Sequence, residues 1–346
     1  MITQTFRRTR ARAPLRLGLA GGGTDLSPYC DEFGGAVLNV TIDRFAFASF
    51  LPRTDEGITF ESDDTGATET FGLYAPLSAA KLILHRGVYE RMIAEFNEGV
   101  RLPLTIKTTV DAPAGSGLGS SSALVVALVS GMGALLGAPL GDYDIAHLAF
   151  EIERHDLGLS GGRQDQYAAA FGGINYIEFL PSDRVIVNPL RVRGAVNNEL
   201  ESSLIVCFSG RSRSSAAIID KQTEGIKSAS PQTLDALHKL KADAGEMKRA
   251  LLVGDIDRMG EVLNASWKAK QRTATGISTD KIDELFDLAM ANGAIAGKVS
   301  GAGGGGFMFF LVHPENRYRL VEKLTAAGAA ATPVKFTQNG CEVWQF

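Results

Sequence analysis

A long stretch without any charged side chain, from residue 112 to residue 141, constrains the fold of this chain more than any other feature. Its centre, ALVVALVSGMGALLGAPL, is almost wholly apolar, so a helix here must be packed on all sides or lie in a membrane. Ser130, Gly131 and Gly133 interrupt the apolar run, and Pro139 ends it. These interruptions favour a helix buried in the core of a large domain over a membrane span.

The rest of the chain shows two styles of secondary structure. Residues 1–190 mix strands, such as RLPLTIKTTV and GGINYIEFL, with amphipathic helices. After about residue 200, a strand (SLIVCFSG) precedes three expected helices, two strands, a further helix and two terminal strands. This order predicts an α+β fold with antiparallel pairing rather than repeated βαβ units. The polar segment RVRGAVNNELESS marks a boundary near residue 195, so we expect domains at 1–195 and 196–346.

Composition and charge exclude several classes of function. The net charge of −4 at pH 7 leaves no electrostatic footprint for nucleic acid. The arginine-rich start, MITQTFRRTRARAPLRL, lacks the apolar core and cleavage site of a signal peptide, and its alternation predicts an exposed edge strand. Cys30, Cys207 and Cys341 fit neither a zinc spacing nor a disulfide framework. We therefore expect a cytoplasmic monomer or homodimer with no membrane partner.

One glycine cluster, GSGLGSSSALVVALV, follows the strand-like LTIKTTV and opens the uncharged helix. Free backbone N–H groups, the positive end of a helix and several hydroxyls would meet there, which favours a bound phosphate. A plain turn with a serine N-cap would need only one serine. The segment is not a Walker A loop, because no Gly-Lys-Ser/Thr is present.

Two further glycine clusters are less specific. SGAGGGGF matches G-x-G-x-x-G, but the strand FMFFLV follows it where a dinucleotide-binding fold needs a helix. We therefore expect a loop between two strands whose backbone passes close to another segment or a ligand. LGLAGGGTDL, taken alone, fits a hairpin turn as well as a ligand contact.

The segments APLRLGLAGGGTDL, PAGSGLGSSSALVVAL and KVSGAGGGGFMFFL, in this order, resemble the three motifs of the GHMP small-molecule kinases. That superfamily includes galactokinases, homoserine kinases and mevalonate kinases, and the resemblance spans essentially the whole chain. It implies an N-terminal nucleotide-binding α+β domain, a C-terminal ferredoxin-like domain and an active site in the cleft between them. The reaction it implies is phosphoryl transfer from ATP in the presence of Mg²⁺.

The resemblance also implies which residues bind the nucleotide. The loop around the ATP phosphates would comprise Gly115, Ser116, Gly117, Leu118, Gly119, Ser120, Ser121 and Ser122. Mg²⁺ would contact the Ser121 hydroxyl and the carboxylate of Glu153. The residues alone support Glu153 as a metal ligand only in part. Its position at the edge of an apolar helix face is also typical of an ordinary glutamate on the protein surface. Glu151 points further toward solvent.

Two residues match the catalytic positions of the superfamily. Asp165, in LSGGRQDQYAAAFGG, occupies the place of a catalytic base, although an ordinary helix N-cap fits these residues as well. Arg16 matches the basic residue that lies near that aspartate in galactokinases. Beside Asp165, Arg16 would stabilise negative charge on the transferred phosphoryl group. From the residues alone, it is one more cation in an arginine-rich run.

The first motif carries a clue to the substrate. Where galactokinases have Gly-Glu-His-Thr-Asp, this chain has three glycines before Thr24 and Asp25. The resemblance leaves Thr24 and Asp25 to bind sugar hydroxyls, while Gly22 and Gly23 make room for a bulkier or differently placed sugar. The loss of the Glu-His pair argues against galactose. Glycines of the third motif would complete the substrate site, namely Gly301, Gly303 and Gly304.

The version GGGTDLSPY and the pattern FSGRSRSSAAI resemble the heptose kinase branch of the superfamily. Arg213 and Ser215 would hold a phosphate already on the sugar, or form a solvated turn. Lys107, Arg163 and Lys298 are alternatives for that phosphate site.

This resemblance implies a small-molecule sugar phosphate as the substrate. The anomeric hydroxyl of D-glycero-D-manno-heptose 7-phosphate would be phosphorylated to give the 1,7-bisphosphate for surface glycan synthesis. A kinase for another sugar, such as L-fucose, and a catalytically silent sugar-sensing relative are the alternatives.

Overall fold

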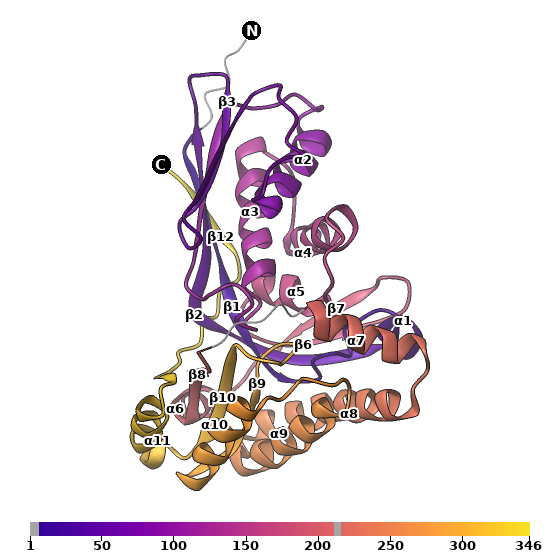
Figure 1. Cartoon of the computed structure of the whole chain (residues 1–346), viewed down its shortest axis with the longest axis vertical. Coiled ribbons are helices and arrows are strands. Elements are labelled where there is room, and N and C mark those ends of the chain that lie inside the picture. Colours follow the sequence, from indigo (N-terminus) through magenta and orange to yellow (C-terminus); the bar gives the residue numbers. More distant parts are fainter. Residues whose placement is uncertain (1–6, 211–215) are drawn as a thin grey trace.

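The computed structural model describes residues 7–210 and 216–346. Within these residues, a large sheet forms one end of the molecule and a smaller sheet forms the other (Figure 1). The large sheet has eight strands in the order β12-β1-β2-β5-β3-β4, and β6 joins it by pairing with both β2 and β7. These strands are β1 (Thr9–Ala20), β2 (Gly35–Pro52), β3 (Gly57–Ser62), β4 (Ala67–Gly72), β5 (Leu104–Val110), β6 (Ile174–Phe179), β7 (Val185–Pro189) and β12 (Glu342–Gln345). Only β3 and β5 pair in parallel in this sheet, so the predicted α+β fold with antiparallel pairing is confirmed.

The smaller sheet is antiparallel throughout, in the order β11-β8-β10-β9. Its strands are β8 (Leu204–Phe208), β9 (Ala294–Val299), β10 (Phe307–Val312) and β11 (Ala330–Pro333). The helices of this half are α6 (Gly194–Ser203), α7 (Ala216–Lys227), α8 (Pro231–Val253), α9 (Ile256–Gln271), α10 (Asp280–Ala291) and α11 (Pro314–Ala326). The polar segment that predicted a domain boundary contains α6. The division at residue 195 stays a prediction.

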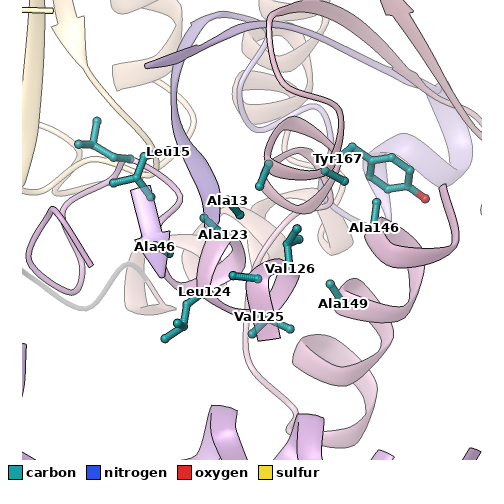
Figure 2. Close-up of a cluster of buried hydrophobic side chains, with 14 of the residues drawn as sticks. Ala13, Leu15, Ala46, Ala123, Leu124, Val125, Val126, Ala146, Ala149 and Tyr167 are labelled. Carbon is teal, nitrogen blue, oxygen red and sulfur yellow. The ribbon is translucent and has the colours of Figure 1, made fainter. Parts of the chain in front are cut away.

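The uncharged stretch forms α3 (Ser120–Leu136), which lies against β1 and β2 and is surrounded by other helices (Figure 1). Those helices are α2 (Ile83–Phe96), α4 (Asp142–Glu151) and α5 (Gln164–Phe171), and the short elements α1 (Tyr29–Phe33) and η1 (Ile152–Asp156, a π-helical turn) complete this half. Figure 2 shows side chains of α3 between those of β1 and those of α4. The prediction of a core helix is therefore confirmed. No helix in the described residues is long and apolar enough to cross a membrane.

Gly131, inside α3, permits close packing of the helix on the sheet. A Cβ at Gly131 would lie 2.1 Å from Cε2 of Phe50, so the aromatic ring of β2 occupies the space that a side chain would need. Phe50 is fully buried beneath this helix. Helix–sheet contact thus explains the glycine at position 131 of the apolar run.

The first strand corrects one prediction from the sequence. We expected the arginine-rich start to form an exposed edge strand, but β1 lies between β2 and β12. Arg12 faces Glu342 across the pairing with β12, and its Nε donates to the Glu342 carboxylate at 2.7 Å. The expectation failed because the last strand of the chain, within the residues expected to form the second domain, returns to the first sheet.

Candidate active site

The three glycine motifs meet where β1, the start of α3 and the loop between β9 and β10 come together. The backbone N–H of Arg16 donates to the Leu118 carbonyl at 3.0 Å, and that of Phe307 donates to the Ser116 carbonyl at 2.8 Å. A Cβ at Gly117, where φ is +80°, would lie 2.3 Å from the carbonyl oxygen of Ser300. Glycine is therefore needed for the close approach of two backbones. The third motif is a loop packed on another segment, as its position between two strands led us to expect.

A cavity of about 320 Å³, here called the phosphate cavity, lies at the start of α3. Six of the eight residues expected to contact the ATP phosphates line it: Gly115, Gly117, Gly119, Ser120, Ser121 and Ser122. The other two, Ser116 and Leu118, are fully buried and do not line it. The first turn of α3 faces this space, so its positive end favours an anion there.

Arg16 and Asp165 form an ion pair at the wall of this cavity. The Arg16 Nε donates to Oδ1 of Asp165 at 2.7 Å, and another of its nitrogens donates to the Gly117 carbonyl at 2.6 Å. The Arg16 residue is 3% exposed, whereas the Asp165 side chain keeps 24% of its surface open. Asp165 lies in the first turn of α5, whose N-cap is Arg163, so it is not the N-cap that the residues alone also allowed.

Ser121 and Glu153 also line this cavity and contact each other. The Ser121 hydroxyl donates to Oε1 of Glu153 at 2.9 Å, and Glu153, within η1, is only 1% exposed. Gln166, which the sequence did not single out, donates its Nε2 to the other oxygen of Glu153 at 2.5 Å and to the Ser122 hydroxyl at 3.1 Å. Glu151 points elsewhere and lies 3.7 Å from Arg91.

A second cavity of about 70 Å³, here called the acceptor cavity, lies on the other side of the Arg16–Asp165 pair. The two cavities share Arg16, Gly162, Asp165, Ile219, Gly301 and Ala302 in their walls. The acceptor cavity is also lined by Gly18, Gly22, Gly23, Asp25, Leu26, Gln164, Gln222, Lys270 and Lys298. A group bound there would reach the phosphate cavity next to the Asp165 carboxylate.

The first motif contributes to the acceptor cavity in two different ways. Gly22 and Gly23 line the cavity, as predicted from the departure from galactokinases. Gly21 is structural, since a Cβ there would lie 2.0 Å from the Ala36 carbonyl oxygen. Thr24 is fully buried, and its hydroxyl lies 2.8 Å from the Gly21 carbonyl and accepts from the Ala36 N–H at 3.0 Å. The structure therefore corrects the expectation that Thr24 binds a sugar hydroxyl.

Asp25 lines the acceptor cavity, but protein donors already surround its carboxylate. Oδ2 accepts the backbone N–H groups of Arg163 and Gln164 at 3.0 and 3.1 Å. Oδ1 accepts the Gly23 N–H at 3.0 Å and the Gln164 Nε2 at 3.1 Å. Asp25 thus holds the N-terminus of α5, one residue before Asp165, by satisfying its free N–H groups.

Of the third-motif glycines expected at the substrate, Gly301 lines both the phosphate cavity and the acceptor cavity, whereas Gly303 and Gly304 line neither. The Gly304 N–H donates to the Ile277 carbonyl at 2.8 Å, and a Cβ at Gly303 would lie 2.8 Å from the same oxygen. Gly303 and Gly304 therefore anchor the loop to the segment before α10. That is a correction, and it follows from backbone packing that the sequence does not show.

Two buried lysines face the acceptor cavity. Lys270 of α9 is 5% exposed and donates to the Gly22 carbonyl at 3.2 Å, while Lys298 of β9 is 6% exposed and donates to the Gly18 carbonyl at 3.0 Å. Burial lowers the pKa of Lys270 to about 8 and that of Lys298 to about 7. Lys298 was one of the alternatives for a phosphate site. Lys270 was missed, although it continues the buried face of Leu263 and Trp267 on α9.

A third cavity, of about 260 Å³, joins the phosphate cavity at Gly115, Ser120 and Ser121. Part of its wall comes from residues at the start of α2 and around the end of β5: Leu82, Ile83, Leu84, His85, Val110 and Ala112. The sequence showed this helix but gave no sign that its first turn borders a cavity. Arg213 and Ser215, the expected phosphate contacts, lie outside the described residues.

A glycine- and serine-rich loop at the start of a helix, an Arg–Asp pair and an adjoining cavity on this fold suit a small-molecule kinase. Comparison with known proteins agrees: the N-terminal domain of the GHMP kinases matches residues 83–173 and their C-terminal domain matches residues 247–330. This chain belongs to the GHMP kinase family.

Individual relatives cover the whole chain. It is 41% identical over 337 residues to the D-glycero-alpha-D-manno-heptose 7-phosphate kinase of Campylobacter jejuni, covering 97% of this chain and 98% of that one. The crystal structure of a D-glycero-D-manno-heptose 1-phosphate kinase from Bacteroides thetaiotaomicron is similar, with a TM-score of 0.83, 39% identity and coverage of 98% and 99%. A bifunctional fucokinase/GDP-fucose pyrophosphorylase of Arabidopsis thaliana is 28% identical over 88% of this chain and 30% of its own length.

Proposed function

We propose that this kinase transfers the γ-phosphoryl group of ATP to the anomeric hydroxyl of D-glycero-D-manno-heptose 7-phosphate, giving the 1,7-bisphosphate. The observation that carries this proposal is the 41% identity with the Campylobacter jejuni kinase along almost the full length of both chains. The acceptor cavity supports it, since Gly22 and Gly23 leave its wall open where galactokinases carry a Glu-His pair.

The nucleotide would occupy two connected cavities. The triphosphate fits the phosphate cavity, where the first turn of α3 and three serines face the space. The base fits the mostly apolar third cavity, which opens from the same loop. This arrangement directs the γ-phosphate toward the Arg16–Asp165 pair, which lines both the phosphate cavity and the acceptor cavity.

The residues on the wall of the phosphate cavity fit a magnesium ion. Mg²⁺ in kinases is held by one or two protein oxygens together with phosphates and water. Glu153 and the Ser121 hydroxyl, 2.9 Å apart, would provide these oxygens, and Gln166 would keep the carboxylate oriented. When bound, the ion neutralises charge on the β- and γ-phosphates. The described residues contain no cluster of three or more His, Cys, Asp or Glu side chains for a metal held by protein alone.

The side chains of this chain would perform the transfer as follows. Asp165 takes the proton of the anomeric hydroxyl, whose oxygen forms a bond to the γ-phosphorus while the bond from that phosphorus to the bridging oxygen of ADP breaks. Arg16 orients Asp165 through their 2.7 Å hydrogen bond and places positive charge beside the transferred group. Asp25 holds the start of α5 and thereby the position of Asp165.

The cellular setting and two residues remain predictions from the sequence. Arg213 and Ser215 are proposed contacts of the 7-phosphate, and a monomer or homodimer in the cytoplasm is the proposed state. All three cysteines are free thiols, which suits that compartment.

A substrate panel tests the proposed function. Purified protein with ATP and Mg²⁺ would be assayed against the heptose 7-phosphate, the free heptose, L-fucose and galactose. We expect the highest kcat/KM with the heptose 7-phosphate, and a product whose new phosphorus couples to the anomeric proton in NMR spectra. A higher kcat/KM for L-fucose would favour the alternative suggested by the fucokinase relative. Binding of a sugar without any turnover would favour a sugar sensor.

A further inference from the structure

We propose that Lys270 and Lys298 together form the subsite that binds the anionic group of the sugar acceptor, its phosphate. This inference rests on the proposed function, because it identifies which residues of the acceptor cavity would recognise a substrate that is already phosphorylated. It differs from the assignment of Arg213 and Ser215, which came from the sequence.

The first argument is that both ammonium groups lack a neutralising partner. Each is more than nine-tenths buried, and each donates to one backbone carbonyl, Gly22 for Lys270 and Gly18 for Lys298. An ammonium has three N–H donors, so donors remain for a ligand. Within the described residues, neither lysine has a carboxylate oxygen within 4.0 Å, although buried charges in proteins are usually paired.

The carboxylates near the lysines are engaged elsewhere. Asp165 is bound to Arg16, and Asp25 accepts four hydrogen bonds from Gly23, Arg163 and Gln164. Asp243 of α8 forms an ion pair with Lys239. With Arg16 also in the wall, the acceptor cavity has three basic side chains and two carboxylates, so protonation of both lysines leaves an excess of positive charge. An anion with several acceptor oxygens would balance this positive charge and accept hydrogen bonds from the remaining N–H groups of the two lysines.

The other cations that the sequence suggested for this phosphate already have partners. Arg163 lies 3.2 Å from Asp31 and 2.7 Å from Asp183. Lys107 lies 2.8 Å from Asp63 and lines neither the phosphate cavity nor the acceptor cavity. Lys298 is the only one of the three sequence-derived alternatives that faces the acceptor cavity.

The position of the pair separates it from the nucleotide. Arg16 and Asp165 line both the phosphate cavity and the acceptor cavity. Lys270 and Lys298, in contrast, line only the acceptor cavity of these two. Gly23 keeps the space beside Lys270 open, since a Cβ there would lie 3.1 Å from its Nζ. The glycines of the first motif therefore expose an ammonium group to the acceptor.

The test compares phosphorylated and free acceptors in Lys270→Met and Lys298→Met. Methionine keeps the length of the side chain and removes the charge. We expect KM for the heptose 7-phosphate to rise about 10- to 100-fold in each variant, the scale of a lost charge-assisted hydrogen bond. KM for the free heptose and for ATP should change less than about threefold. Lys227→Met is the matched control, because Lys227 is exposed at a neighbouring cavity and should leave all three constants unchanged.

Two further measurements separate a binding role from a structural one. Thermal unfolding should show no loss of stability in the methionine variants, because a buried ammonium without a carboxylate partner opposes folding. Calorimetry with the phosphate cavity already filled by a non-hydrolysable ATP analogue should show that inorganic phosphate binds the unmodified enzyme more tightly than either variant. This arm needs no turnover, so it tests the lysine site even if the proposed sugar is wrong.

Several results would overturn the inference. An equal rise in KM for the phosphorylated and the free heptose would place the lysines at the sugar ring. A raised KM for ATP would place them at the nucleotide. Inorganic phosphate that binds the methionine variants as tightly as the unmodified enzyme would exclude them from an anion site.

Discussion

The Asp25 carboxylate accepts both the backbone N–H and the side-chain Nε2 of Gln164, each at 3.1 Å, across 139 residues of sequence. This contact joins the glycine-rich turn after β1 to the first turn of α5. Because Asp165 is the next residue, the turn that borders the acceptor cavity also sets the position of the proposed base. Asp25 therefore links the wall of the acceptor cavity to the position of the proposed base.

Substitution of Asp25 by Asn should disrupt this link. An amide in place of the carboxylate cannot accept from all four donors, so at least one buried N–H group loses its partner at a cost of about 1–3 kcal/mol. We expect kcat to fall at least about tenfold, the equivalent of about 1.4 kcal/mol, while the Kd for ATP stays nearly unchanged. Asp31→Asn is the control, because Asp31 contacts only the Arg163 side chain among these groups. Equal kcat in the two variants would contradict the positioning role.

The second prediction concerns the base itself. Asp165→Asn should lower kcat by about 10²–10⁴, the usual contribution of general acid–base catalysis, because the amide cannot take the proton of the hydroxyl. ATP binding, measured by calorimetry, should remain near that of the unmodified enzyme. Asp220→Asn, at the neighbouring cavity, provides a control with little expected effect. Near-normal turnover in Asp165→Asn would remove this residue from the mechanism.

The third prediction distinguishes two glutamates two residues apart. Glu153→Gln should raise the Mg²⁺ concentration needed for half-maximal rate, because the buried carboxylate beside Ser121 is the proposed ligand. Glu151→Gln should not, since Glu151 faces Arg91. The measurement is initial rate against Mg²⁺ at saturating ATP. The same shift in both variants would mean that neither carboxylate contacts the ion.

The fourth prediction is a pH dependence of acceptor binding. The pKa is about 7 for Lys298 and about 8 for Lys270, lowered by burial, so both lose their proton as the pH rises through this range. The charged groups that face them are Arg16, Asp25, Asp165 and Asp243. KM for the heptose 7-phosphate should therefore be lowest below pH 7, where both lysines are protonated, and rise toward pH 9, whereas KM for the free heptose should change less. Parallel profiles for the two sugars would contradict an anion site at the lysines.

Several features of this protein follow from local sequence alone. The uncharged stretch indicated a helix that is either buried or in a membrane, and the glycines, the serine and the proline that interrupt it favoured the buried helix. The same local reasoning predicted a phosphate site at the start of this helix, since glycines and serines there present N–H groups and hydroxyls in one place, and that site stays a prediction. The predicted α+β order followed from the alternation of strand and helix patterns along the chain.

The tertiary structure decided what depends on contacts between distant segments. The sequence suggested an edge strand for β1, but the final strand, more than three hundred residues later, covers that edge through contacts such as Arg12–Glu342. The motif predicted that Thr24 binds a sugar hydroxyl, yet the Thr24 hydroxyl accepts a hydrogen bond from the backbone N–H of Ala36. Lys270 and Lys298 come from different elements and meet at one cavity only after α9 and β9 pack. Local patterns specify elements and loops, whereas the direction and burial of a side chain are set by whatever the rest of the chain packs against it.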